Sequence, residues 1–261
     1  MKQELTRPII KVGNSAGVIL PKEWLHGRAR IELVEKPLDI KKDILEILEP
    51  YLEDAIGIYI VGSYARGEQT ARSDVDVLVI TNSTNKTLEK GKYSIILLEK
   101  SKVDLSLENN IIPLLPMIKE AKPLINKDLI EKYKETKLTK KNLKGHIELT
   151  KSALKVNRAS IDLDKEMDSL CDDSTAYSLI LRLREGYIVD CLMKNKLWSN
   201  KELLKIIKKI TGSTKAYEGY LRAKENKKIE EELPREEAEK LLNYVNKKIK
   251  EHEVWVKRKK S

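Results

Sequence analysis

Two aspartates that lie two positions apart, Asp74 and Asp76, are the residues best suited to chemistry in this sequence. They alternate with Val75, Val77 and Val79 in an apolar run, which predicts a β-strand. Because successive side chains of a strand point to opposite faces, both carboxylates share one face, roughly 7 Å apart along the chain. Mg²⁺ prefers oxygen ligands and is usually held by one or two carboxylates together with substrate phosphates. The pair therefore indicates a magnesium site that acts on a phosphate-bearing substrate.

A glycine–serine pair stands just upstream, where the chain leaves another predicted strand. Gly62-Ser63 follows directly on the apolar run 56–61. Glycine lets the backbone approach a ligand closely, and a helix that starts near Tyr64 would direct free N–H groups toward an anion. The residues of this segment that we expect to bind the phosphates of a nucleotide are Gly62, Ser63, Arg66 and Arg72.

A third carboxylate fits the same plan. The run Val103-Asp104-Leu105-Ser106-Leu107 alternates polar and apolar residues, which predicts a further strand with Asp104 on its polar face. If this strand lies beside the one with Asp74 and Asp76, three acids meet and can hold two cations about 4 Å apart for a phosphoryl displacement. Asp104 is then a metal ligand or a general base; the alternative is an exposed acid on an edge strand.

The spacing of these residues resembles that of the nucleotidyltransferases of the DNA polymerase β superfamily, and most closely the minimal nucleotidyltransferases of archaea and bacteria. The shared pattern is Gly-Ser, ten residues, then Asp-x-Asp, with Ser73 just before the first acid and a later single aspartate. The resemblance covers about residues 52 to 108. It implies that Gly62, Ser63 and Ser73 contact the triphosphate of ATP or another nucleoside triphosphate. It also implies that Asp74, Asp76 and Asp104 bind two Mg²⁺ ions, or Mn²⁺ in their place, while a nucleoside monophosphate is transferred and pyrophosphate leaves.

The composition sets the class of protein and its partners. The chain has 261 residues, of which 35% are charged and 41% hydrophobic, with a formal net charge of +10. A basic protein accumulates near nucleotides and nucleic acids, although a lysine-rich solvated surface is the alternative. Cys171 and Cys191 are far apart in the sequence, and we expect both to be reduced thiols. Without a signal core or an apolar run long enough to span a bilayer, we expect a cytoplasmic protein with no membrane partner.

Residues 1–36 form a first predicted domain that is rich in β-structure. Residues 9–12 and 16–20 predict a hairpin around Gly13-Asn14-Ser15, 21–25 a short helix and 28–34 another strand. The segment KVGNSAGVILPKEWL resembles the swapped-hairpin domains of the AbrB/MazE type. That resemblance implies a homodimer that presents Lys11, Arg28 and Arg30 to DNA phosphates. Dimerisation without DNA binding is the alternative.

The rest of the chain predicts two further domains and an α+β fold. Residues 37–126 hold the nucleotidyltransferase motif, with a helix over 38–53 and a kinked helix over 111–121. Residues 127–261 are almost wholly helical and predict an antiparallel bundle of four or five helices. Its tyrosines and basic residues near 177–187 and 217–224 are either nucleotide contacts or ordinary packing and solvated groups.

Two functions follow from these patterns. The first is an Mg²⁺-dependent enzyme that transfers AMP from ATP to an acceptor hydroxyl on a protein, an RNA or a small molecule, the helical domain binding the acceptor. The second is a DNA-binding regulator or antitoxin that uses its N-terminal domain on DNA, the transferase fold serving partner binding. The sequence contains neither a P-loop nor a dinucleotide-binding glycine motif.

Overall fold

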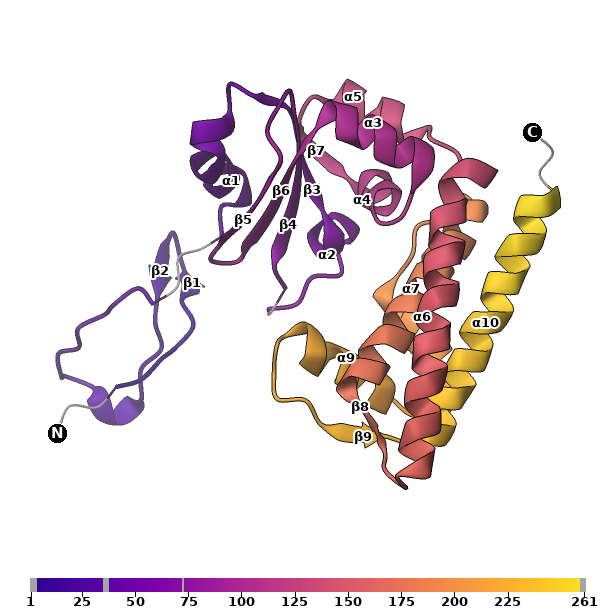
Figure 1. Ribbon diagram of the computed structural model, residues 1–261. Helices are drawn as coiled ribbons and strands as arrows, with labels where there is room; N and C mark the ends of the chain where they lie inside the picture. The colour runs from indigo at the N-terminus through magenta and orange to yellow at the C-terminus, as the bar shows by residue number, and fades with distance from the viewer. Residues whose placement is uncertain (1–3, 35–37, 72, 259–261) are drawn as a thin grey trace. The chain divides into compact units, whose positions relative to one another are not determined.

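The computed structural model describes residues 4–34, 38–71 and 73–258 (Figure 1). The chain divides into two compact units, Met1–Asp39 and Ile40–Ser261. The domain boundary predicted after residue 126 lies inside the second unit, at the start of a helix, so the three-domain division stays a prediction. Within the described ranges, no helix is both long and apolar enough to cross a membrane.

The N-terminal unit contains the predicted hairpin and little other regular structure. Strands β1 (Ile10–Val12) and β2 (Ser15–Gly17) pair antiparallel, and a single 3₁₀ turn, Lys22–Trp24, replaces the short helix. The strand predicted over 28–34 is wrong, because that segment has no regular structure. A strand needs a neighbour to satisfy its backbone hydrogen bonds, and this unit offers it none.

The same unit has no core of its own. No residue from 4 to 34 is buried, and ten large apolar side chains are exposed: Leu5, Ile9, Ile10, Val12, Ile19, Leu20, Leu25, Ile31, Leu33 and Val34. Such a unit is too small to bury enough apolar surface by itself. The AbrB-like topology is therefore not confirmed by a single chain.

The second unit is built on a five-stranded mixed sheet with the strand order β5-β6-β4-β3-β7. β3 and β4 are antiparallel, β4 and β6 parallel, and the edge strands β5 and β7 antiparallel to their neighbours. The strand bounds are β3 Ala55–Val61, β4 Val75–Thr81, β5 Lys86–Lys90, β6 Tyr93–Glu99 and β7 Lys122–Ile125. The strands predicted on either side of the Gly-Ser turn, β3 and β4, are confirmed.

Helices cover both faces of this sheet because β4 is apolar on both sides over most of its length. On one face Val75, Val77 and Val79 pack against Ile44 and Leu48 of α1. On the other face the core includes Leu78 and Ile80 together with residues of α3, α4 and α5. The helix bounds are α1 Ile40–Leu48, followed by the 3₁₀ turn Glu49–Tyr51, then α3 Lys100–Asn109, α4 Leu114–Glu120 and α5 Lys127–Lys134.

The strand predicted over 103–107 is wrong, because this segment lies inside α3. Val103 and Leu107 are both buried and stand four residues apart, which is the spacing of neighbours on one helix face. Leu105, which the alternating pattern assigned to the core, is 60% exposed. The helix predicted over 111–121 is confirmed as α4, in which Pro116 falls in the first turn, where proline is tolerated.

The C-terminal half forms a helical bundle, as the sequence predicted. Its three longest helices, α6, α7 and α10, lie side by side (Figure 1). The bounds are α6 Lys140–Glu166, α7 Asp173–Met193, α8 Asn200–Thr211, α9 Lys215–Lys224 and α10 Arg235–Arg258. Two short strands, β8 Cys171–Asp172 and β9 Glu231–Leu233, form an antiparallel pair, and β8 ends directly before α7.

Candidate active site

The Gly-Ser turn connects β3 to the short helix α2 (Gly62–Arg66) and requires glycine at its first position. Gly62 has φ +69°, a left-handed conformation that other residues adopt only with strain. A Cβ atom built on Gly62 would lie 2.1 Å from Oδ2 of Asp76. The contact arises because Val61 and Asp76 are paired in the β3–β4 register. The absence of a side chain at position 62 therefore leaves the room that the Asp76 carboxylate occupies.

The strand predicted around Asp76 is confirmed, but it begins at Val75, so a shared face for Asp74 and Asp76 stays a prediction. Asp76 is partly buried on β4, and Asp74 is exposed just before that strand. Within the described part of the chain, neither carboxylate has a hydrogen bond or an ion pair. Burial raises the pKa of Asp76, Lys224 opposes that rise, and the charge of Asp74 adds to it. A partly buried carboxylate without a partner is unfavourable and suits a cation.

These two acids fit a hard divalent ion, but a third acid does not join them. Across residues 4–34, 38–71 and 73–258, no three His, Cys, Asp or Glu side chains are grouped so that they hold a metal. The carboxylates of Asp74 and Asp76 offer oxygen ligands, which is the donor type that Mg²⁺ prefers. Asp74 and Asp76 are therefore the residues here that would hold it.

The prediction that Asp104 meets Asp74 and Asp76 is wrong. β6 begins beside Val75, runs parallel to β4 and ends beside Thr81, so α3 and Asp104 follow the opposite end of β4 from Asp76. Asp104 is 48% exposed, forms an ion pair with Lys100 at 2.9 Å and accepts a hydrogen bond from Tyr133 at 2.6 Å. Its pKa is lowered, because these two hydrogen bonds outweigh the effect of burial. Asp104 therefore has a local structural role on the surface.

Arg66 is not a free cation for a phosphate. Its side chain is only 6% exposed, and its guanidinium donates to Glu120 at 2.5 Å and to Glu68 at 3.0 Å. Glu120 also accepts the backbone N–H of Gly62 at 2.6 Å. Burial raises the pKa of Glu120, and the charge of Arg66 opposes that rise. The ion pair of Arg66 with Glu120, and the hydrogen bond from the Gly62 N–H to Glu120, thus stabilise the Gly-Ser turn.

The remaining predicted nucleotide contacts lie in the loop around the motif. The backbone carbonyl of Ser63 accepts hydrogen bonds from the N–H groups of Gly67 and Glu68, which closes the turn. The hydroxyl of Ser73 accepts the backbone N–H of Thr70 at 2.9 Å. Arg72 lies outside the described residues.

Glu68 joins the motif to the helical half. Its carboxylate accepts from the Ser199 hydroxyl at 2.6 Å and from the Asn200 N–H at 3.2 Å, at the first turn of α8. A carboxylate there satisfies open N–H groups and complements the helix dipole. Sequence reasoning missed both Glu68 and Glu120, because nothing local distinguishes them from other surface acids.

The helical half also brings positive charge and tyrosines toward Asp76. The charges of Lys224 on α9 and Arg184 on α7 act on the Asp76 carboxylate. In the part of the chain that the structure describes, neither side chain forms an ion pair, and Arg184 donates a hydrogen bond to the Tyr220 hydroxyl at 3.5 Å. Tyr220 stacks on Tyr177 and Tyr217, with ring centroids 5.4 Å and 5.7 Å apart. This side of the site can therefore accommodate an anion.

The three basic residues predicted to bind DNA belong to the N-terminal unit. Lys11 lies on β1, and Arg28 and Arg30 lie in the irregular segment after Gly27. All three side chains are exposed. Their role on DNA stays a prediction.

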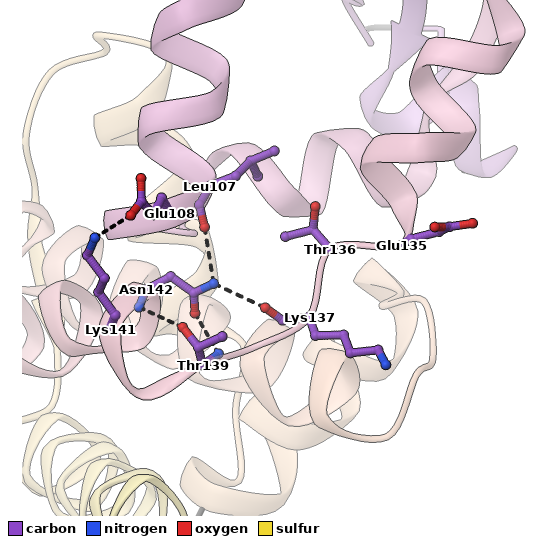
Figure 2. Close-up of a pocket in the computed structure, with 8 residues that line it drawn as sticks. All are labelled: Leu107, Glu108, Glu135, Thr136, Lys137, Thr139, Lys141 and Asn142. Carbon is purple, nitrogen blue, oxygen red and sulfur yellow. Dashed lines mark hydrogen bonds and ion pairs between the residues drawn. The ribbon is translucent and has the colours of Figure 1, made fainter. Parts of the chain in front are cut away.

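A surface hollow in the second unit does not belong to this site (Figure 2). It lies between α3 and the start of α6, where Lys141 pairs with Glu108 at 2.5 Å. The Asn142 side chain donates to the carbonyls of Leu107 and Lys137, and it forms a capping box with Thr139. Four of the polar side chains that line the hollow, those of Glu108, Lys141, Thr139 and Asn142, therefore already have partners within it and hold the loop before α6.

Comparison with known proteins shows what the region that contains this site is similar to. Residues 40–147 match the model of a family described as nucleotidyltransferase domain. MJ0141 of Methanocaldococcus jannaschii, provisionally named a protein adenylyltransferase, is 40% identical over 62 residues, which are 24% of this chain and 60% of that relative. The match thus spans less than two thirds of the relative's length.

Two crystal structures resemble the chain more distantly. One is a nucleotidyltransferase-like protein from Exiguobacterium sibiricum 255-15, with 14% identity, a TM-score of 0.36 and coverage of 84% of this chain and 80% of that one. The other is a spectinomycin adenyltransferase from Enterococcus faecialis with ATP and spectinomycin, with 13% identity, a TM-score of 0.43 and coverage of 80% and 97%. Similarities of this size carry no conclusion about the substrate.

Proposed function

We propose that this chain, whose residues 40–147 form a nucleotidyltransferase domain, transfers AMP from ATP to an acceptor hydroxyl in a Mg²⁺-dependent reaction. The observation that carries the proposal is that Asp74 and Asp76 have no partner within the described residues, and that the Asp76 carboxylate occupies the space left by Gly62. In the reaction the acceptor oxygen bonds to the α-phosphorus, the bond to the pyrophosphate oxygen breaks, and the hydroxyl proton passes to a base.

The chain's own residues divide this work between them. Asp74 and Asp76 would hold Mg²⁺, which acts as a Lewis acid on the phosphate oxygens when bound. Ser63 offers its hydroxyl to the triphosphate, since the Gly62 N–H is already taken by Glu120. Lys224 and Arg184 offset the charge of the triphosphate from the helical side. Arg66 acts indirectly, by holding the turn through Glu120.

The acceptor belongs to one of three classes, a protein, an RNA or a small molecule. The provisional name of the archaeal relative favours a protein. To distinguish the classes, the purified chain is incubated in a host lysate with Mg²⁺ and ATP labelled at the α-phosphate, and each sample is divided between protease and ribonuclease. Label removed by protease identifies a protein acceptor, label removed by ribonuclease identifies RNA, and label that survives both identifies a small molecule. The control is the Asp74→Asn/Asp76→Asn variant, and equal label in both samples would contradict the proposal.

A second function is favoured by the uncovered apolar side chains of the N-terminal unit. We infer that two copies of residues 4–34 pair, since the unit has no buried residue as a single chain. Placing charges at Val12 and Ile31, as Val12→Glu/Ile31→Glu, should reduce the mass measured by light scattering from two chains to one. A wild-type chain that is monomeric at micromolar concentration would contradict the pairing.

Such a pair would present Lys11, Arg28 and Arg30 to DNA, as a DNA-binding regulator or antitoxin does. Removing one side chain that binds a phosphate should lower the slope of log affinity against log salt by about 1. The Arg28→Ala/Arg30→Ala variant is therefore expected to bind duplex DNA with a slope lower by about 2. An unchanged slope would show that neither arginine binds a phosphate.

A further inference from the structure

The 27-residue helix α6 carries a row of exposed apolar side chains (Figure 1). Leu149, Val156 and Leu163 are 56%, 68% and 55% exposed and stand seven residues apart. Because seven residues make almost two turns of an α-helix, the three side chains lie in line along one face. On the other side of the same helix, Leu154 and Ile161 are buried in the core of the bundle. The helix therefore has a second apolar face besides the buried one.

This row is symmetric about Val156. Leu149 and Leu163 stand seven residues before and after it, and Ala153 and Ala159 stand three residues before and after it. In an antiparallel pair of identical helices centred on Val156, each leucine faces the other leucine of the second copy, and Val156 faces itself. The alanines flank the row, where small side chains allow two helices to approach closely. The face is thus complementary to a second copy of itself.

The charges along α6 favour the same antiparallel direction. Before Val156 the helix carries five lysines and one glutamate, and after it three acids against Arg158 and Lys165. An antiparallel pair places the basic part of each copy beside the acidic part of the other. A parallel pair would instead place the lysines of both copies together, which is unfavourable.

We propose that α6 pairs antiparallel with α6 of a second copy of this chain, centred on Val156. The inference rests on the pairing of residues 4–34 stated under the proposed function. Three half-exposed apolar side chains per copy cannot reach the roughly 1,000 Å² that a stable interface buries, so this contact does not hold two free chains together. Chains already joined at their N-terminal units meet at an effective concentration in the millimolar range, at which the α6 contact forms.

Cysteine cross-linking of the full chain tests this contact. Cys171 and Cys191 are buried, so an added exposed thiol reports on its own position. Val156→Cys should give a disulfide-linked dimer on a non-reducing gel after mild oxidation, because the two copies meet at this residue. The matched control is Lys165→Cys, at an exposed position about 200° around the helix from Leu163, which should give no more dimer than wild type.

Two leucine positions report the direction of the pair. The variant Leu149→Cys/Leu163→Cys should form the linked dimer, because residue 149 of one copy lies beside residue 163 of the other. Leu149→Cys alone and Leu163→Cys alone should not, because each thiol then faces a leucine. If Leu149→Cys alone links as strongly as Val156→Cys, the helices are parallel and the proposed arrangement is wrong.

The outcomes separate this contact from the pairing of the N-terminal units. If light scattering gives a mass of two chains but Val156→Cys links no more than Lys165→Cys, the N-terminal pairing stands and the α6 contact is wrong. A mass of one chain removes the N-terminal pairing, and the α6 contact with it. Linking by Val156→Cys and by the double leucine variant, but by neither single leucine variant, is the result that the symmetry predicts.

Discussion

Gly62→Ala tests whether the position of the Asp76 carboxylate depends on the absence of a side chain at residue 62. Alanine at this position meets two obstacles, the positive φ of +69° and the carboxylate oxygen 2.1 Å from its Cβ. The first costs about 1–2 kcal/mol of folding free energy. The second cannot be relieved without moving either the turn or Asp76, since an ordinary contact begins at 3.4 Å. A displacement of about 1 Å at a reacting centre is enough to slow catalysis about 100-fold.

Gly67→Ala is the matched control, because it carries the first obstacle without the second. Gly67 ends α2 with φ +72°, and a Cβ built on it meets nothing within 4 Å. Gly67→Ala should therefore lose about 1–2 kcal/mol of unfolding free energy in urea titrations, and Gly62→Ala at least as much. Only Gly62→Ala should slow the initial rate of α-label transfer by about 100-fold.

Two results would refute this role of Gly62. If Gly62→Ala transfers label as fast as Gly67→Ala, the position of Asp76 does not depend on an open space at residue 62. If Gly67→Ala loses activity equally, the backbone conformation of the turn, rather than the contact with Asp76, is what matters.

Three further predictions concern neighbouring groups. Glu68→Gln should destabilise the folded chain by about 1 kcal/mol in urea titrations, because it removes the carboxylate at the start of α8. The control is Glu202→Gln, which removes an exposed acid from the first turn of the same helix. A loss of stability no larger than that of this control would contradict the prediction. Asp104→Asn should leave the transfer rate near that of wild type, and a large decrease would restore the role that the sequence suggested. Burial lowers the pKa of His146 to about 3, so the unfolded chain binds the proton first and stability falls as pH drops below about 6.5, by about 2 kcal/mol at pH 5. His146→Gln should remove that part of the difference in unfolding free energy between pH 8 and pH 5, and an unchanged difference would show that His146 is not its source.

The parts of the site that could be predicted from sequence are those set by local pattern. The apolar runs before Gly62 and around Asp76 are long enough to form strands in any context, and the β3–β4 pairing then brings the two motifs together. None of this required knowledge of the rest of the fold. Asp76 lies on β4, as the apolar pattern predicts, whereas Asp74 lies just before the strand, so strand geometry does not fix its face.

The mispredicted parts depend on contacts that sequence spacing does not reveal. Val103 and Leu107 satisfy both a period of two and a helical spacing of four, and only their packing beside Ile80 in one core favours the helix that carries Asp104 away. The strand expected over 28–34 has no neighbouring strand among the described residues. Glu120 reaches Gly62 across 58 positions, which no local pattern shows.

The most direct test of the account compares two labels on the same nucleotide. The full chain is incubated with Mg²⁺ and its acceptor-containing lysate, once with ATP labelled at the α-phosphate and once with ATP labelled at the γ-phosphate. Nucleotidyl transfer predicts that the acceptor gains only the α-label, that pyrophosphate carries the γ-label, and that Asp76→Asn abolishes both. Acceptor labelled from the γ-position, or α-labelling that persists in Asp76→Asn, would contradict the account.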